Sequence, residues 1–509
     1  MRDNRDLSKN MKHIMVVYLM LLIGLIGYIT YFYLFQAPKI AAKPTNSVAF
    51  AQEHKILRGT VYDSSMQKIA YSVKEGTGQK RIYPSGALYG AIVGYDSPRF
   101  GLDPGSLEQI YNKTLTTYTP SNKFSIKEAF ENRGKALSMT GDGIVTTLNA
   151  GLQKTAWQAM KSQMAALSAK TGRTVDTGAV VALDPKTGAI LASVTMPTFD
   201  PNDLAAAMEQ ANADQKAGKQ AFEFINQVTE NPTAPGSVFK MVTLTSSLQN
   251  IPGVSNRIFD DKGYVKISKD YTLPNEGWEA YGEIGLARAL SVSSNVVFGT
   301  LGMELGNTAL KTTAESFGFN QSIPANGVYI APSNFPTLKQ GSLGAMAQSA
   351  IGQGETTATP MQIALVASTI ANGGVMMEPT LVKEIVNSQG KVLQTIEPKS
   401  LGRKMTPAEA AEITKDMRYV TEQRQGYPAH VWDYMNPKFD IASKTGTAQK
   451  AFANGKMDPV TDAWFACFAP ANDPKIAIAV KIVNGGAGSV IGANIAYQMI
   501  DEYLTQTGM

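Results

Sequence analysis

Ala179-Val-Val-Ala-Leu-Asp-Pro-Lys-Thr-Gly-Ala-Ile-Leu-Ala-Ser193 is the stretch that decides the fold class of this chain. Its two short apolar runs flank a turn over Asp184 to Gly188, which is the pattern of a β-hairpin. Helical stretches follow, and apolar runs at 463–469 and 476–483 then predict two more strands. Because strands lie at both ends of a helical middle, we expect one α+β domain with an antiparallel sheet flanked by helices.

The composition excludes several classes of function. The chain has 509 residues, 44% hydrophobic and 17% charged, which is typical of two or three globular domains. The single cysteine, Cys467, rules out an intramolecular disulfide and is expected in a buried strand. The three histidines, His13, His54 and His430, fit neither a zinc site nor a Ser-His-Asp triad, so no metal or other cofactor is expected. A dispersed net charge of +5 argues against nucleic-acid binding.

Residues 14–35 predict a single N-terminal transmembrane helix. This segment has 22 residues without a charge, enough to cross a hydrocarbon core about 30 Å thick. It is too long for a signal peptide, and no Ala-x-Ala site follows it. Four basic residues precede this segment: Arg2, Arg5, Lys9 and Lys12. They predict that the tail over 1–13 is cytoplasmic. The chain is then expected to be a single-pass protein of the cytoplasmic membrane with an extracytoplasmic catalytic domain.

The exported part is expected to contain a linker and two domains. Residues 36–55, with scattered prolines, read as a linker. Residues 56–147 alternate short apolar stretches with turn signals and predict a small α+β module without catalytic groups, a pedestal. Residues 148–509 form the larger domain, which closes with a helix over about 493–504.

Three short motifs follow one another in the larger domain: Ser237-Val-Phe-Lys240, Ser293-Ser-Asn295 and Lys444-Thr-Gly-Thr447. This order is typical of enzymes whose serine is acylated by a peptide or a β-lactam. Each motif alone is weak, because spare matches occur at Ser65 to Lys68, Ser388 to Lys391, Lys170 to Gly172 and Lys186 to Gly188. Only Lys444 opens a Lys-Thr-Gly triplet downstream of both partners, so order and context identify the site.

The residue types indicate a serine nucleophile with a lysine base. Ser237 follows Pro235-Gly236 at a predicted helix start, and Lys240 shares its face three residues later. A lysine with a pKa of about 10.4 is a poor base at neutral pH, so burial and a nearby positive charge must lower that pKa. Lys444 can supply this charge. The alternative is that Ser237 only caps a helix and Lys240 is solvated.

Beyond these motifs, the chain resembles class B penicillin-binding proteins, which are membrane-anchored peptidoglycan D,D-transpeptidases, over nearly all its length. The segments that carry the resemblance in the pedestal and the catalytic domain are Arg58–Asp63, Tyr83–Leu88, Gly101–Glu108, Gly178–Pro185, Pro197–Asn202, Gly352–Glu355, Thr359–Gln362 and Trp464–Phe465. Two departures affect only pedestal or junction geometry: Asp63–Gln67 lacks a glycine common in this turn, and Asn149 stands where aspartate is common.

The resemblance implies roles for the remaining motif residues. Ser293 relays a proton to the leaving amine and Asn295 binds a substrate amide, although both could simply be helix caps. Lys444 with the hydroxyls of Thr445 and Thr447 recognises the terminal carboxylate, while the backbone N–H groups of Ser237 and Thr447 form the oxyanion hole. From the residues themselves, we expect a strand at the cleft edge, where Gly446 allows close approach of an extended substrate.

The resemblance also implies the reaction and the partners. Ser237 attacks the penultimate D-Ala of a stem pentapeptide on lipid II-derived glycan, and an amine of a neighbouring stem resolves the acyl-enzyme into a cross-link; β-lactams inhibit covalently. Because no glycosyltransferase domain precedes the pedestal, a polytopic lipid II glycosyltransferase is the expected partner. The alternatives are a D,D-carboxypeptidase, a β-lactam-hydrolysing enzyme or sensor, and a catalytically silent scaffold of the wall-synthesis complex.

Overall fold

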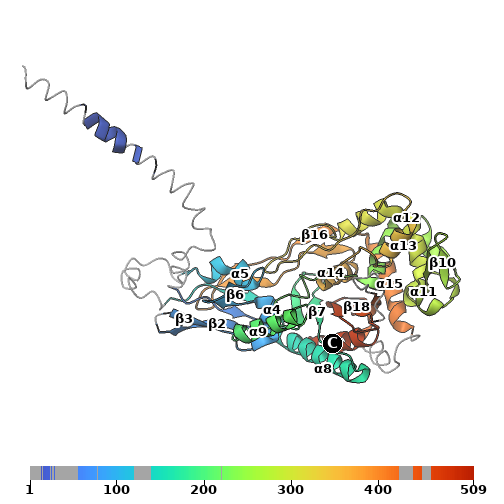
Figure 1. Ribbon diagram of the computed structural model, residues 1–509, viewed down its shortest axis with the longest axis horizontal. Helices are drawn as coiled ribbons and strands as arrows, with labels where there is room; N and C mark the ends of the chain where they lie inside the picture. Colours follow the sequence, from blue (N-terminus) through green and yellow to red (C-terminus); the bar gives the residue numbers. More distant parts are fainter. Residues whose placement is uncertain are drawn as a thin grey trace, which may run out of the picture.

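The computed structural model describes residues 13, 15–22, 24–25, 28, 56–76, 78–119, 139–218, 220–423, 439–449 and 460–508. Two β-sheets organise these residues. Figure 1 shows the smaller body with β2, β3 and β6 at one end of an elongated molecule, and the helix-rich part with α11, α12 and α13 at the other.

The central sheet of the larger domain has five antiparallel strands in the order β17-β18-β19-β7-β8. The expected hairpin is confirmed as β7 and β8, and the two expected C-terminal strands as β18 and β19. Strand β17, which carries Lys444, lies at the edge of the sheet, where an extended peptide could pair with it. The bounds are β7 Gly178–Leu183, β8 Ile190–Met196, β17 Ala442–Ala448, β18 Asp462–Ala469 and β19 Ile476–Ile482.

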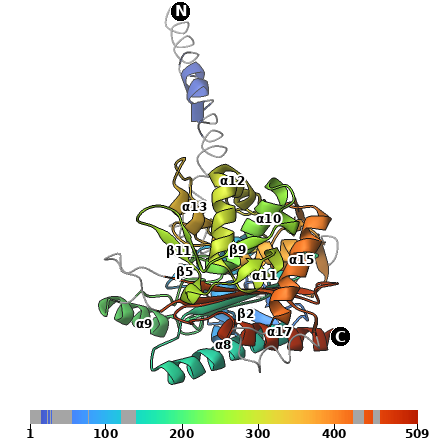
Figure 2. The same ribbon diagram turned by 90° about the vertical axis from the view of Figure 1, so that its right-hand side faces the viewer.

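Helices cover both faces of this sheet, which explains why its strands are continuous apolar runs. On one face lie α8, Ala150–Thr171, and the closing helix α17, Ile491–Gln506, as Figure 2 shows. On the other face lies α14, Pro360–Ala371. Alternate residues of β18 therefore enter two separate cores: Cys467 packs with α8 and α17, and Trp464 packs on the side of α14. Cys467 is buried, as expected.

The pedestal sheet draws strands from distant parts of the chain. Its order is β15-β14-β6-β1-β2-β3, with β1 and β6 parallel and the other pairs antiparallel. Two strands, β14 and β15, come from within the range 148–509, so the sheet crosses the expected boundary at 147/148. The bounds are β1 Val61–Tyr62, β2 Lys68–Glu75, β3 Gly78–Ile82, β6 Gly143–Thr146, β14 Val382–Val386 and β15 Val392–Thr395.

A buried ion network holds the pedestal together. The Glu108 carboxylate is fully buried and binds Arg58 Nε at 2.6 Å and Arg81 Nη2 at 2.8 Å. The Tyr83 hydroxyl lies 3.2 Å from the same carboxylate. Both guanidinium groups hold the pKa of Glu108 below its usual range although burial acts to raise it. Segments that are far apart in sequence are thus joined by one charged group.

The remaining elements fall into two groups. Those of the pedestal are η2 Gly86–Tyr89, α4 Gly90–Val93, β4 Asp96–Ser97, β5 Gly101–Leu102, α5 Leu107–Ile110 and α6 Asn112–Leu115. Those of the larger domain are α9 Leu204–Lys216, η4 Gly236–Phe239, α10 Lys240–Asn250, η5 Val254–Asn256, β9 Phe259–Asp261, β10 Tyr264–Lys266, β11 Thr272–Pro274, η6 Glu276–Trp278, β12 Gly282–Ile284, α11 Leu286–Ser291, α12 Asn295–Ser316, α13 Leu343–Ala350, β13 Val375–Met377, β16 Ser400–Arg403 and α15 Pro407–Glu422.

The expected N-terminal segments lie largely outside the described residues. This holds for the tail over 1–13 apart from His13, for half of the expected transmembrane segment over 14–35, and for the linker over 36–55. Among the residues that the structure describes, no helix is both long enough and apolar enough to cross a membrane. The transmembrane helix therefore stays a prediction.

The structure shows what happens at the two positions where the chain departs from the family pattern. Asn149 caps α8, since its side chain accepts a hydrogen bond from the Leu152 N–H at 2.9 Å, a role that aspartate performs equally well. In the turn between β1 and β2, which lacks that glycine, Met66 has a φ of +66°, in the left-handed region that favours glycine. A left-handed conformation costs a residue with a side chain about 1–2 kcal/mol.

We therefore expect Met66→Gly to stabilise the pedestal by about 0.5–1 kcal/mol, because relief of the left-handed strain exceeds the entropy that glycine adds to the unfolded chain. Hydrogen exchange of peptides covering β1 and β2 would measure this local free energy of opening. Gln67→Gly, in the same exposed turn but without a positive φ, is the control and should be neutral or destabilising. Faster exchange in Met66→Gly would contradict the argument.

Candidate active site

Three elements bring the motif residues together. Ser237 lies on η4, which continues directly into α10, so Lys240 is the first residue of that helix. Ser293 lies between α11 and α12, and Asn295 opens α12. Lys444 lies on β17, which packs against η4. Residues far apart in sequence therefore meet where a helix start, a loop and an edge strand converge.

The Ser293 hydroxyl lies between the two lysine amines. Lys444 Nζ is 2.9 Å from Ser293 Oγ, and Lys240 Nζ is 3.2 Å from the same atom. Lys240 Nζ also donates to the Ser293 carbonyl oxygen at 2.6 Å and to Asn295 Oδ1 at 2.9 Å. The second partner of Lys444 is the Thr445 carbonyl oxygen at 2.9 Å. One hydroxyl can thus accept from one amine and donate to the other.

Burial lowers the pKa of both amines, so each loses its proton at a lower pH than an exposed lysine does. Both lysine side chains are fully buried. Burial lowers the pKa of Lys240 well below 10.5, and the neighbouring Lys444 lowers it further. Burial lowers the pKa of Lys444 to about 7, opposed by the Glu276 carboxylate. Because the pKa of Lys240 is affected more strongly, we infer that Lys240 is the neutral base and Lys444 carries the charge.

Ser237 lies beside this cluster without a direct bond to it. Among the hydrogen bonds of the described residues, none joins Ser237 Oγ to Lys240 Nζ, although the two side chains share one face of a continuous helical segment. Ser237 is partly exposed, whereas its neighbours Gly236 and Val238 are buried. The hydroxyl is therefore open to a substrate, and the contact to the base must shorten in the reactive complex.

Glycines allow η4 to approach β17 closely. A Cβ at Gly236, which has φ of +57°, would lie 2.6 Å from the Thr447 carbonyl oxygen. A Cβ at Gly352 would lie 2.1 Å from the Gly236 carbonyl oxygen, and the Gly236 N–H donates to Gly352 O at 2.9 Å. Side chains at either position would push Ser237 away from the strand.

The residues of β17 divide between its two faces. Thr445 and Thr447 are partly exposed on one face, as expected for side chains that meet a substrate, while Lys444 and Gly446 are buried on the other. A Cβ at Gly446 would lie 2.9 Å from Trp464 Cβ and 3.1 Å from Val238 Cγ1. The structure therefore gives Gly446 a packing role beneath η4, and its expected role in substrate approach stays a prediction.

A buried polar network that sequence analysis missed positions the Ser-Ser-Asn motif. Asn275 Oδ1 accepts from the N–H groups of Asn295 at 2.8 Å and Val296 at 3.1 Å. Its amide nitrogen donates to the Asp261 carboxylate, which accepts from the Ser294 hydroxyl at 2.6 Å. These side chains hold the first turn of α12 against the lobe formed by residues 259–284, and no periodic signal in the sequence marks them.

Ser293 itself has a strained backbone, with φ of +56°. The strain follows from its place between two helices, since α11 ends at Ser291 and Ser294 caps α12 by accepting from the Val297 N–H at 3.0 Å. Non-glycine residues in this conformation persist only where the surroundings over-determine it, and they cluster at functional sites. The conformation directs both the carbonyl and the hydroxyl of Ser293 to Lys240.

The spare motif matches lie away from this cluster. Ser65 is in the pedestal turn before β2, and Ser388 is in the connection between β14 and β15. Lys170 is in the last turn of α8, which Gly172 ends, and Lys186 is in the β7–β8 turn, where it pairs with Asp473 at 2.6 Å. The order of the motifs thus selected the matches that the structure brings together.

No metal site is evident within the described part of the chain, because no three His, Cys, Asp or Glu side chains gather there as ligands. His54 and His430 lie outside the described residues. The absence of a metal or cofactor therefore stays a prediction.

Comparisons with known proteins give matches in two parts of the chain. A model of the penicillin binding protein transpeptidase domain matches residues 178–501, and one of the penicillin binding protein A dimerisation domain matches residues 58–132. The chain is similar to peptidoglycan D,D-transpeptidase PbpA of Mycolicibacterium smegmatis, with 30% identity over 94% of each chain. It is 28% identical to PbpA of Mycobacterium tuberculosis, covering 98% of this chain and 99% of that one.

Solved structures show the same similarity. The penicillin G acyl-enzyme complex of penicillin-binding protein A from M. tuberculosis has a TM-score of 0.75 and 28% identity, and covers 88% of this chain and 100% of that one. The D,D-transpeptidase domain of a peptidoglycan glycosyltransferase from Eggerthella lenta has a TM-score of 0.73 and 30% identity, and covers 89% of this chain and 99% of that one.

The pKa directions predict a bell-shaped pH dependence for the acylation of Ser237 by a penicillin. The rate should rise as Lys240 loses its proton, well below pH 10.5, and fall as Lys444 loses its charge near pH 7. Stopped-flow acylation or intact mass over a pH series would measure it. Lys240→Arg should reduce the rate by at least about 10³-fold. Lys404→Met, which removes a lysine outside the cluster whose pKa burial also lowers, should leave the profile unchanged.

Proposed function

The chain belongs to the family of penicillin-binding protein transpeptidases, and we propose that it is a peptidoglycan D,D-transpeptidase that cross-links stem peptides through an acyl-enzyme on Ser237. One observation carries the assignment of the residues: two buried lysines converge on the Ser293 hydroxyl beside a partly exposed Ser237. This arrangement supplies a base, a proton relay and a cation around one nucleophile without a histidine.

Substrate binding uses the edge strand. The stem peptide pairs with β17 in an extended conformation, and its terminal carboxylate meets the charge of Lys444 and the hydroxyls of Thr445 and Thr447. Asn295 binds an amide of the peptide. The backbone N–H groups of Ser237 and Thr447 receive the oxygen of the scissile carbonyl as it becomes negative.

Acylation is then a proton-coupled substitution. Ser237 Oγ attacks the carbonyl carbon of the penultimate D-Ala while neutral Lys240 takes the hydroxyl proton. The C–N bond to the terminal D-Ala breaks, and the proton reaches the leaving amine through Ser293 Oγ. Ser293 suits this relay because its hydroxyl lies within 3.2 Å of Lys240 Nζ.

Deacylation runs the same path with a different amine. The amine of a neighbouring stem attacks the acyl carbon, its proton passes to Lys240, and the bond between that carbon and Ser237 Oγ breaks as the oxygen regains a proton. Water in place of the amine would give a D,D-carboxypeptidase. The acyl-enzymes of the M. tuberculosis protein with penicillin G and imipenem support the same serine chemistry with β-lactams for this chain.

The first test follows the purified full-length protein by intact mass with benzylpenicillin and then with a D-Ala-D-Ala pentapeptide plus an acceptor stem. A stable adduct that maps to Ser237, and a cross-linked product that increases with acceptor concentration, are expected. Ser237→Ala should abolish both; Ser65→Ala, which alters a spare motif, should change neither. Rapid release of hydrolysed penicillin would favour a β-lactamase, and full function of a Ser237→Ala strain would favour a scaffold.

We also propose the setting of this reaction. The uncharged segment over 14–35 anchors the chain in the cytoplasmic membrane with residues 1–13 inside and the catalytic domain outside. A polytopic lipid II glycosyltransferase supplies the glycan strands and contacts the anchor and the pedestal. The pedestal suits a contact role, because its charged network is internal and the catalytic cluster lies in the other domain.

Replacing the anchor over 14–35 with an unrelated transmembrane helix should weaken co-purification of the glycosyltransferase from detergent extracts, and exchanging the pedestal surface should weaken it further. Penicillin acylation of Ser237 should stay unchanged in both variants, which controls for folding. Unchanged co-purification after both replacements would refute this partner contact, and a soluble chain after fractionation of the wild type would refute the anchor.

A further inference from the structure

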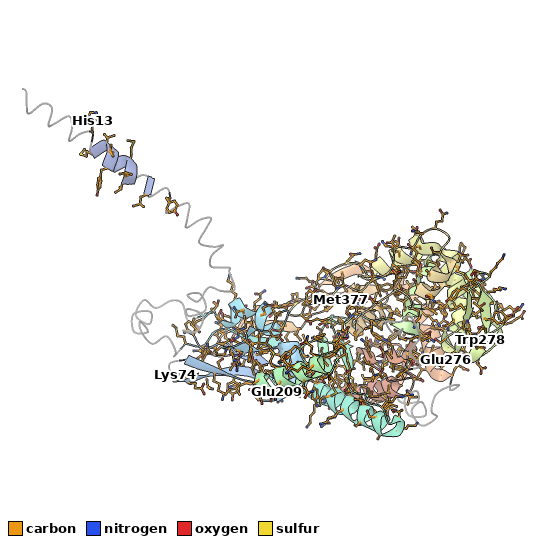
Figure 3. All side chains as sticks on the ribbon, viewed as in Figure 1. His13, Lys74, Glu209, Glu276, Trp278 and Met377 are labelled. Carbon is orange, nitrogen blue, oxygen red and sulfur yellow. The ribbon has the colours of Figure 1, made fainter. Side chains whose placement is uncertain are left out.

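The lobe formed by residues 259–284 presents an exposed aromatic pair that the mechanism above does not use. Trp278 is 60% exposed and Tyr264 is 49% exposed, with ring centroids 6.0 Å apart. Figure 3 shows Glu276 and Trp278 near one another at the end of the molecule away from the pedestal. A pair of large aromatic side chains that is exposed to solvent is typical of a binding surface.

Trp278 is held in a strained conformation. Its φ is +60°, directly after Gly277 with φ of +63°. A bulky residue in the left-handed region costs about 1–2 kcal/mol, so the surrounding structure must impose it. The turn at Gly263 packs beneath it, because a Cβ there would lie 2.5 Å from the Trp278 carbonyl oxygen. The exposed indole is therefore on a fixed backbone.

This loop is bonded to the catalytic Asn295. The Asn295 side-chain amide donates to the Pro274 carbonyl oxygen at 2.9 Å, and the Asn295 N–H donates to Asn275 Oδ1 at 2.8 Å. Glu276 is the next residue along the chain, and Trp278 follows two residues later. The start of this loop is thus fixed to Asn295, one of the motif residues.

Glu276 favours the charged form of Lys444, but it makes no direct contact with that amine among the hydrogen bonds and ion pairs of the described residues. Its side chain is exposed, and within the described part of the chain it has no ion-pair partner. Its carboxylate raises the pKa of Lys444 and of Lys240, and so opposes the neutral form that the base requires. A carboxylate that disfavours the base but faces solvent suits a cation arriving from outside.

We propose that Glu276 and Trp278 form the acceptor subsite, where the carboxylate and the indole face bind the protonated amine of the incoming stem peptide. The inference rests on the transpeptidase function proposed above. A primary alkyl amine has a pKa of about 10.4 and is a cation in neutral solution, so both groups attract it. The bound amine loses one proton to solvent and attacks the acyl carbon as the neutral amine; its second proton passes to neutral Lys240 and from there to Ser237 Oγ as the ester bond breaks, as in the deacylation step above.

Partitioning of the acyl-enzyme between amine and water tests this subsite. The full-length protein in detergent is acylated by a D-Ala-D-Ala donor, and the ratio of cross-linked to hydrolysed product is measured against the concentration of an acceptor stem with a side-chain amine. Glu276→Gln and Trp278→Ala should each lower this ratio about 5–10-fold through a weaker acceptor KM, a change of about 1–1.4 kcal/mol. Penicillin acylation, compared at each variant's optimum pH, should stay within about twofold of wild type.

Control variants show whether a lower ratio comes from Glu276 and Trp278 themselves or from the loss of any exposed carboxylate or aromatic ring. Glu283→Gln removes an exposed carboxylate of the same lobe, and Tyr329→Ala removes a 51% exposed aromatic ring elsewhere; neither should change the ratio. Glu276→Asp and Trp278→Phe should lower the ratio of cross-linked to hydrolysed product less than Glu276→Gln and Trp278→Ala do. Added salt should raise the acceptor KM of the wild type but not of Glu276→Gln, because only the former attracts the amine by charge.

The outcomes distinguish the two proposals. An unchanged ratio in both Glu276→Gln and Trp278→Ala, with normal cross-linking by the wild type, would overturn the subsite and leave the transpeptidase intact. The subsite is also overturned if these variants slow penicillin acylation but leave the ratio of cross-linked to hydrolysed product unchanged. The two side chains would then act on the donor peptide and not on the acceptor. Hydrolysis alone by the wild type at every acceptor concentration would overturn the transpeptidase proposal and the subsite with it.

Discussion

The burial of two lysine amines around the Ser293 hydroxyl is the constraint on which the rest of the larger domain depends. Removing Lys240 and Lys444 from water is unfavourable unless each finds acceptors, and each finds them only where α10, the start of α12 and β17 converge. The tight glycine contacts beneath η4 and the polar network behind α12 both serve this convergence. The same burial that costs stability lowers the pKa of the base into a useful range.

Much of this arrangement could be predicted from the sequence, because it depends on short local patterns: apolar runs, turn residues and three short motifs. The hairpin around Asp184 and the C-terminal strands follow from apolar runs and a turn, and the order of three motifs selected Ser237, Lys240 and Lys444. The Asp261–Asn275 network could not be predicted, since single buried hydrogen bonds leave no period in a sequence. Pairing of β14 with β6 was equally hidden by the long separation of the two strands.

The two domains are joined by more than their covalent connections. The pedestal sheet takes β14 and β15 from the later part of the chain, so neither sheet is complete until most of the chain is present. Thr147 marks the junction, because its hydroxyl lies 2.7 Å from the Ile190 carbonyl oxygen and 3.0 Å from that of Thr380. The pedestal and the catalytic sheet are therefore fastened to one another at the start of β8. A substitution at this junction affects both domains at once.

The edge position of β17 carries a hazard as well as a function. Within the described part of the chain no strand pairs with its outer side, and an unpaired edge can recruit a strand from another molecule and begin aggregation. Proteins commonly protect such edges with a charged side chain that points inward, and Lys444 on this short strand is one. The lysine proposed for catalysis is thus also a buried charge on the edge strand, which disfavours pairing of that strand with a second molecule.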